Sequence, residues 1–490
     1  MIVCDWLWML LMTNRVSQVC ICLLAFLASL PSSAPAEEFE VRPLTGAEKA
    51  VIDLIQESRV LKTVSYLASD EMNGRDTPSQ ELTTAATFVA ERFQTAGLKG
   101  LGTDGSFFQT TELFRVSAPK SKALLSSGSE NDVPLIVLTG PNETLKISGV
   151  VQEESVRNKP KTGDDGSSIY IIDEFPIPPQ ATDDPVATLI TYVRRMIPLV
   201  RRGAKIVLVR VADDSILLDV AAALQQNPVT IPSQFEPQCA IVLVSATRPL
   251  KGEITLEVPA NVREAIPVHN VVGVLRGSDA QASKQAVIVS AHLDHIGPAP
   301  RGDDKVNNGA DDNASGVTGV LMLADAFAAL KVRPKRSIIF VTFWGEEKGL
   351  LGSKEFVNHP LWNLNNVVCD INLEMIGRPE AMAEGKAWGT GWSHSSLGPQ
   401  MAAGAIRAGV TITQHEKFGE MLYTRSDNAS FVAKGVIAHS FSAGSLHNDY
   451  HQPTDEVEKL NIPHMTKVIQ GLMAGILPIA SGELTPVASR

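Results

Sequence analysis

Two adjacent glutamates, Glu346 and Glu347, follow an apolar run in the segment FVTFWGEEKGLLGS, residues 340–353. The apolar run is typical of a buried strand, and the small and turn-forming residues after it end that strand. In open α/β sheets, ligands bind beyond the carboxyl ends of the strands. A carboxylate pair at this place therefore indicates a binding or catalytic site. On a surface helix, the same pair would simply be exposed to solvent.

Four further groups of acidic and histidine residues lie at the ends of predicted strands or in the loops after them. They are SAHLDHIG (His292, Asp294, His295), NNGADDNASG (Asp311, Asp312), INLEMIG (Glu374) and SLHNDYHQPTDE (His447, Asp449, Tyr450, His451, Asp455). Each group alone has a structural explanation; ADDNASG, for example, also fits a helix N-cap. Strand ends meet at one edge of a parallel sheet, however, and carboxylates gathered there stay ionised only beside a cation.

Two Zn²⁺ ions would supply the missing positive charge. Their four charges balance three carboxylates, those of Asp312, Glu347 and Glu374, together with one hydroxide. Zinc favours mixed histidine and carboxylate ligands in sites that keep a position open for water. The combination of groups thus predicts a zinc centre.

The elements that must position these groups follow from the pattern along the chain. Residues 45–98 have apolar residues at helical spacing, and residues 116–265 consist of short strand-like runs between Ser, Pro, Gly and Asp clusters. From residue 266 onward, apolar strands alternate with helices, which predicts an α/β fold with a mixed, largely parallel sheet covered by helices on both faces. We expect a signal peptide (1–36), a main α/β domain in two parts (37–115 and 266–490) and an inserted β-rich domain (116–265).

The N-terminus predicts export. The uncharged run VCICLLAFLASL, residues 19–30, is followed by small residues ending at Ala36, as in a cleaved secretory signal. The run is shorter than the roughly 20 residues that span a bilayer, so we expect a periplasmic or extracellular protein without a stable membrane span, although an uncleaved anchor is the alternative. A net charge of -11 argues against nucleic acid as a partner.

In order along the chain, HLDH, GADDNASG, FWGEEKGLLGS, NLEMIG, SDNASF and DYHQPTDE resemble the motifs of the secreted di-zinc aminopeptidases. That family shares its fold with glutamate carboxypeptidase II and the transferrin receptor ectodomain. The resemblance covers residues 45–115 and 266–480. It implies a zinc exopeptidase that acts on peptides, and the segment between the two parts resembles a protease-associated domain.

The resemblance also implies roles for individual residues. His292, Asp312 and Glu374 would bind one zinc ion, and Glu347, His451 and the bridging Asp312 would bind the other. Asp294 would hold the His292 imidazole by its second nitrogen. Glu346 would be the general base.

Two positions in this resemblance stay open. The family usually has Asp where this chain has Glu374, and Asp370 on the same strand face is the alternative ligand. Tyr450 is expected to stabilise the oxyanion, with Tyr423 as the alternative.

Three other functions on this scaffold are also compatible with the sequence. A carboxypeptidase would need a basic pocket, for which Arg425 and Arg378 are candidates. A glutaminyl cyclase would have a single zinc, which the intact GADDNASG segment disfavours. A receptor or binding module should have lost metal ligands, and all ligand positions here keep metal-competent side chains.

Overall fold

The computed structural model describes residues 39–117, 262–380 except 300, 301 and 303, 385–489 except 445, and short stretches between 124 and 260. The predicted signal peptide lies outside these residues. Among the helices described, none is long and apolar enough to cross a membrane.

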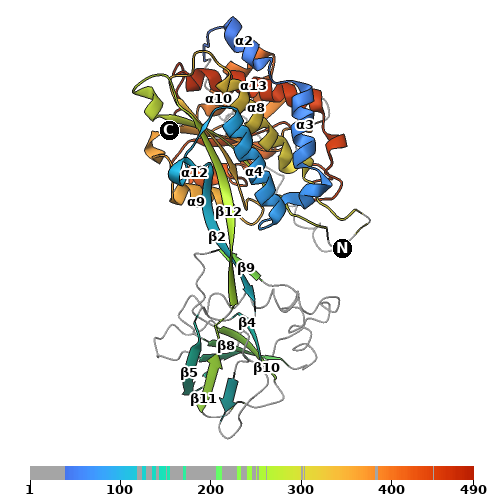
Figure 1. Ribbon diagram of the computed structural model, residues 1–490, viewed down its shortest axis with the longest axis vertical. Helices are drawn as coiled ribbons and strands as arrows, with labels where there is room; N and C mark the ends of the chain where they lie inside the picture. The colour runs from blue at the N-terminus through green and yellow to red at the C-terminus, as the bar shows by residue number, and fades with distance from the viewer. Residues whose placement is uncertain are drawn as a thin grey trace, which may run out of the picture.

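A ten-stranded sheet forms the larger body (Figure 1). Its strands lie in the order β17 (Thr411–Gln414), β16 (Lys386–Gly389), β18 (Ala438–Ser442), β15 (Val367–Leu373), β13 (Ala286–His292), β14 (Ser337–Phe343), β12 (Val262–Leu275), β2 (Phe108–Ser117) and β9 (Val229–Pro232), with β1 (Lys99–Gly100) beside β12. The four neighbours β18, β15, β13 and β14 pair in parallel, as do β16 and β17. The pairs of β12 with β14, β2 and β1 are antiparallel. The predicted α/β class with a mixed sheet is confirmed, and its parallel part is the centre that carries the site.

Helices cover both faces of this sheet because its central strands are apolar on both sides. In β13, Val287 and Val289 face a core formed with α3 (Glu57–Leu67), α4 (Gln80–Thr95), α8 (Gly316–Ala328), α10 (Leu397–Ala405) and α13 (Ile462–Ala480). The alternate residues Ala286 and Ile288 face a second core with α9 (Leu351–Asn358) and α12 (Asn428–Val432). This burial on both faces explains why the strands are continuous apolar runs.

The N-terminal helical stretch is divided into α2 (Gly46–Ile52) and α3. Helix α2 begins at a capping box, in which the Thr45 side chain accepts a hydrogen bond from the backbone N–H of Glu48 and the Glu48 side chain accepts one from the backbone N–H of Thr45. Arg42 forms an ion pair with Glu48 at 2.5 Å. The hydrogen bond from Arg42 is the main cause that lowers the pKa of Glu48 to about 2.

This lowered pKa predicts a pH-dependent contribution to stability. A carboxyl with a lowered folded-state pKa stabilises the fold above its unfolded pKa, near 4.5, and loses that effect as pH falls through about 2. We expect Glu48→Gln to reduce the free energy of unfolding at pH 7 by about 1 kcal/mol or less, because Arg42 is partly exposed. Urea unfolding of both proteins should show a difference that shrinks below pH 4. A difference independent of pH would contradict the ion-pair explanation.

A smaller second body holds the strands from the segment predicted as an inserted domain. Strands β4 (Leu135–Thr139), β10 (Ala240–Ser245), β8 (Ile206–Val211), β7 (Ile169–Ile172) and β6 (Gln152–Glu154) form one sheet, and β3 (Leu124–Ser127), β11 (Glu253–Val258) and β5 (Leu145–Val150) form another. Figure 1 shows β2 and β12 running from the large sheet toward these strands. The predicted boundaries, 115/116 and 265/266, fall inside β2 and β12, so a continuous two-stranded ribbon joins the two bodies.

Candidate metal centre

The parallel strands bring the predicted site residues to one edge of the sheet. His292 is the last residue of β13, Glu346 and Glu347 follow β14, and Glu374 follows β15 directly. Asp312 lies in a π-helical turn, residues 310–315, that leads into α8. His451 comes from the loop after β18. Because β14, β13, β15 and β18 are neighbours that run in the same direction, their carboxyl ends deliver these side chains to a common space.

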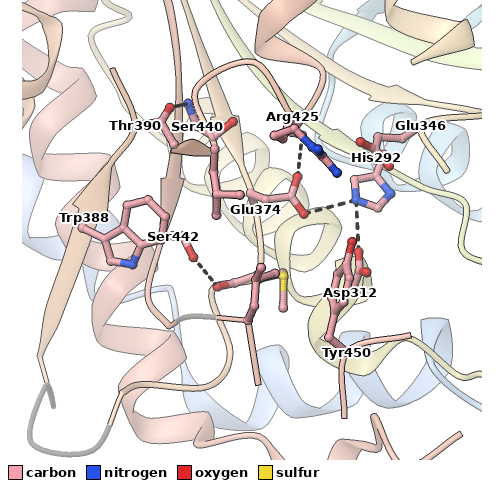
Figure 2. A pocket seen from close by; sticks show the side chains of 14 residues that line it. His292, Asp312, Glu346, Glu374, Trp388, Thr390, Arg425, Ser440, Ser442 and Tyr450 are labelled. Carbon is pink, nitrogen blue, oxygen red and sulfur yellow. Dashed lines mark hydrogen bonds and ion pairs between the residues drawn. The ribbon is translucent and has the colours of Figure 1, made fainter. Parts of the chain in front are cut away.

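Two groups of side chains form there, and the first contains His292, Asp312 and Glu374. The His292 Nε2 atom lies 3.3 Å from Asp312 Oδ1 and 3.2 Å from Glu374 Oε1 (Figure 2). Glu374 is held by its other oxygen, which accepts a 2.6 Å hydrogen bond from the Ser426 hydroxyl. The extra methylene of Glu374 therefore still allows its carboxylate to reach the His292 imidazole.

The second group contains Asp312, Glu347, His451 and His295. The His451 Nε2 atom lies 3.2 Å from Asp312 Oδ2 and 3.1 Å from Glu347 Oε2. The His295 Nδ1 atom lies 2.9 Å from Glu347 Oε1 and 3.8 Å from Asp312 Oδ2. Asp312 belongs to both groups and directs one oxygen toward each.

The two groups suit zinc by their chemistry and by their spacing. Two ligand atoms at tetrahedral zinc, each about 2.0–2.1 Å from the ion, are about 3.4 Å apart. The separations of 3.1–3.3 Å between ligand atoms within the two groups match that spacing. Asp312 Oδ2 and His451 Nε2 are buried atoms that make no hydrogen bond with any described residue. Unsatisfied buried polar atoms need a partner, and a metal ion between them would supply it.

The electrostatics of the centre indicate that protons compete with a metal for it. Burial lowers the pKa of His451, but the carboxylates of Asp312 and Glu347 raise it more, to about 10. Burial likewise opposes the charged form of His292, yet the carboxylates of Glu374 and Glu346 hold its pKa well above the usual value. Imidazole binds a metal only when it is deprotonated, so metal binding should release protons.

Glu346 and Glu347 are adjacent in the chain but have different surroundings. Glu347 contacts His295 and His451, as described above. Glu346 lines a pocket beside the centre together with Tyr450. Burial, with the charges of Asp427 and Glu374 as neighbours, raises the pKa of Glu346 well above the usual carboxyl value. Its carboxylate also lies close enough to His292 and Glu347 to form a third possible metal-binding group.

Asp294 contacts His292 differently from the sequence-based expectation. Its backbone carbonyl lies 3.0 Å from His292 Nδ1, whereas its nearest carboxylate oxygen is 3.8 Å away. The Asp294 carboxylate instead accepts hydrogen bonds from the backbone N–H of Glu346 and from the Thr77 hydroxyl, at 3.0 and 3.1 Å. Asp294 therefore fixes the backbone that carries the two glutamates. Burial raises its pKa to about 6.

The two tyrosines lie in different places. Tyr450 lines the pocket, and its ring stacks on the His451 ring with centroids 3.9 Å apart. The Tyr423 ring stacks between His394 and His439, at 4.4 and 5.5 Å, and does not line this pocket. The alternative ligand Asp370 accepts a 2.8 Å hydrogen bond from Ser290 inside the sheet and is not in any of the three groups found among the described residues.

Arg75 supports the centre and was given no role in the sequence analysis. It is 1% exposed, and its guanidinium donates hydrogen bonds to the backbone carbonyls of Leu67, Leu293, Asn308 and Gly309. It thus ties the loop after β13 to the loop that carries Asp312. Burial lowers its pKa to about 10, and its charge lies behind the acidic cluster. Nothing in the local sequence distinguishes such an arginine from a surface residue, because its partners are backbone atoms far away in the chain.

His295 is the last residue of the HLDH motif, and the sequence alone predicts no role for it. It is fully buried, and its ring packs over Gly309, where an added Cβ would come within 2.6 Å of the imidazole. The contact with Glu347 Oε1 leaves Oε2 of that carboxylate 3.1 Å from His451 Nε2. A hydrogen bond that orients a ligand typically changes metal affinity by about 10- to 100-fold.

We therefore expect His295→Ala to weaken the binding of one of two zinc ions by about 10- to 100-fold. Zinc titration against a chelating indicator should show one site with unchanged zinc affinity and one site with lower zinc affinity. His394→Ala is the matched control, because that histidine pairs with Glu420 on the surface. Two unchanged zinc affinities in the His295 variant would contradict this role.

The sequence of this region is similar to a known protein family. Residues 270–475 match the model of peptidase family M28. This match to peptidase family M28 agrees with the resemblance found in the sequence.

Individual relatives are more distant. A probable zinc metalloprotease from Phaeosphaeria nodorum is 36% identical over 135 residues, covering 25% of this chain and 26% of the relative. Aminopeptidase YwaD from Bacillus subtilis is 24% identical over 248 residues, covering 48% and 49%. A vacuolar membrane protease from Clavispora lusitaniae is 24% identical over 215 residues, covering 44% and 19%. The chain thus spans less than half the length of each of these three relatives.

Among solved structures, an aminopeptidase from Aneurinibacillus sp. strain AM-1 superposes with a TM-score of 0.48 at 18% identity, covering 88% of this chain and 95% of that one. A zinc aminopeptidase from Bacillus subtilis gives a TM-score of 0.47 at 18% identity, with 86% and 94% covered.

Proposed function

We propose that this protein is a di-zinc metallo-exopeptidase that removes N-terminal residues from peptides. The observation that carries the proposal is the position of Asp312, whose two carboxylate oxygens face two separate groups of metal-competent side chains. The match of residues 270–475 to peptidase family M28 and the aminopeptidase among the relatives support the choice of reaction. Peptide is accordingly the proposed substrate.

In this proposal His292, Asp312 and Glu374 hold one zinc ion, and Asp312, Glu347 and His451 hold the other. Zinc ions bound there would lower the pKa of a water molecule and polarise the scissile carbonyl. Glu346, which lines the pocket, takes a proton from the attacking water and delivers it to the leaving amine. The Tyr450 hydroxyl donates a hydrogen bond to the oxyanion of the tetrahedral intermediate.

The two tyrosines provide a direct test of the oxyanion role. Because Tyr450 lines the pocket and Tyr423 does not, we expect Tyr450→Phe to lower kcat by about 100-fold and Tyr423→Phe to leave it within about threefold of the wild type. Steady-state kinetics on a leucine p-nitroanilide would measure both. A larger loss in the Tyr423 variant would reverse the assignment.

Digestion of a mixed peptide pool by the zinc-loaded full chain, followed by mass spectrometry, tests the reaction itself. The same pool acetylated at its N-termini is the control. Loss of N-terminal residues from the free pool alone supports an aminopeptidase. Loss from the C-terminus in both pools supports the alternative, a carboxypeptidase similar to glutamate carboxypeptidase II, which Arg425 on the pocket favours. Absence of cleavage in both pools contradicts an exopeptidase and favours a binding module.

The remaining parts of the proposal concern the chain outside this domain. The predicted signal peptide would export the protein to the periplasm or the medium. The strands between β2 and β12 would form a protease-associated domain that restricts access to the cleft.

A further inference from the structure

The pocket beside the candidate metal centre is lined by two kinds of side chain (Figure 2). On one side it reaches His292, Asp312, Glu346 and Glu374. The rest of its lining includes the apolar side chains of Met375, Trp388, Leu422 and Leu446 and the hydroxyl groups of Thr390 and Ser442. A peptide carbonyl at the centre would therefore direct a neighbouring part of the substrate along this wall.

Arg425 is the one lysine or arginine among the described residues that line this pocket. Its side chain is exposed and makes no ion pair or hydrogen bond with any other described residue. In the view of Figure 2 it extends over the pocket next to Glu374 and His292. The other candidate cation, Arg378, already pairs with Asp449 at 2.8 Å and does not line the pocket. Arg425 is thus a free guanidinium at the place where substrate would lie.

The charges around Arg425 favour an anion in the working enzyme. In the proposed centre, two zinc ions carry four positive charges, and Asp312, Glu347, Glu374 and Glu346 carry four negative charges. These charges would balance one another within the centre, so the centre itself would leave the Arg425 guanidinium available to an anion. A guanidinium binds carboxylates through two parallel hydrogen bonds, a geometry that an ammonium group cannot reproduce.

We propose that Arg425 binds a carboxylate of the substrate next to the scissile bond. This inference rests on the proposed exopeptidase function and adds a substrate class to it. The carboxylate has two possible sources, the side chain of an acidic N-terminal residue and the free C-terminus of a dipeptide. In either case the apolar wall, including Trp388 and Leu422, packs against the methylene or side-chain carbon atoms of the substrate.

Four peptides distinguish these sources. Glu-Ala-Ala-amide and Gln-Ala-Ala-amide differ only in the charge of the first side chain, and Ala-Ala and Ala-Ala-amide differ only in the charge of the C-terminus. The kcat/KM of each would be measured for the wild type, Arg425→Met and Arg425→Lys. Arg333→Met is the matched control, because Arg333 is exposed at the opposite edge of the sheet, before the start of β14. Calorimetric binding of free glutamate and glutamine measures the first discrimination without turnover.

We expect the wild type to prefer one charged peptide over its neutral partner, and Arg425→Met to reduce kcat/KM for that peptide alone by about 10- to 100-fold. Arg425→Lys should recover part of the loss. Discrimination within the glutamate pair assigns the carboxylate to the first side chain, and discrimination within the dipeptide pair assigns it to the C-terminus.

Cleavage of the neutral peptides with no effect of Arg425→Met on either pair would overturn this inference and leave the proposed exopeptidase intact. Absence of cleavage of all four peptides contradicts the proposed function instead. In that case, binding of glutamate and of glutamine that Arg425→Met leaves unchanged also overturns the inference.

Discussion

Glu346→Gln is expected to lower kcat by about 10²- to 10⁴-fold while the protein still binds two zinc ions. The amide keeps the size of the carboxyl but cannot accept a proton from water, and Glu346 is the glutamate of the pair that lines the pocket. Peptide hydrolysis and metal analysis of the same preparation would measure both quantities.

The adjacent residue provides the control. Glu347 contacts His295 and His451, so we expect Glu347→Gln to lose zinc as well as activity. If Glu346→Gln also loses one zinc ion, the third possible group of His292, Glu346 and Glu347 is a real binding site and Glu346 is a ligand rather than a base.

The pH dependence of the wild-type activity also tests the role of Glu346 as a base. Burial raises the pKa of its carboxyl, and only the ionised form can act as a base. Activity should therefore rise with pH as this group ionises.

The helices and strands with a simple pattern of apolar residues were predictable from the sequence. Strands β13, β14 and β15 are short apolar runs followed by Gly or by polar residues, and α8 and α13 have apolar residues throughout. The side chains that converge were predictable for a related reason, because each of them lies at the end of a parallel strand or in the loop after it. The helical spacing over residues 45–98 did not show where individual helices end, and the structure ends α2 at Ile52 and begins α3 at Glu57.

The supporting residues could not be predicted in the same way. Arg75 lies 218 positions from Leu293, one of the carbonyls it binds, and no local pattern marks a residue whose partners are backbone atoms of other loops. The role of Asp294 depended on which of its atoms faces His292, which the spacing H-x-D does not determine. Stacking of Tyr423 between two histidine rings likewise arises only from the tertiary fold.

Asp312→Ala is expected to have the largest effect on metal binding, because it removes a ligand from both groups at once. Its two oxygens lie 3.3 Å from His292 Nε2 and 3.2 Å from His451 Nε2, so both zinc affinities should fall by more than the roughly 10- to 100-fold typical of a residue that only hydrogen-bonds to a ligand. Glu374→Ala is the informative comparison. Glu374 belongs to one group only, so its loss should lower the affinity for one zinc ion and leave the other unchanged.

Zinc titration of the two variants and of Asp449→Asn would measure this difference. Asp449 pairs with Arg378 and Lys459 outside the three groups, so its substitution should leave both zinc affinities unchanged. Loss of both ions in Asp312→Ala, together with loss of one in Glu374→Ala, requires a carboxylate shared between two metals. If Asp312→Ala weakened a single ion, the two groups would be independent sites, and the bridged centre on which the proposed peptidase reaction depends would be wrong.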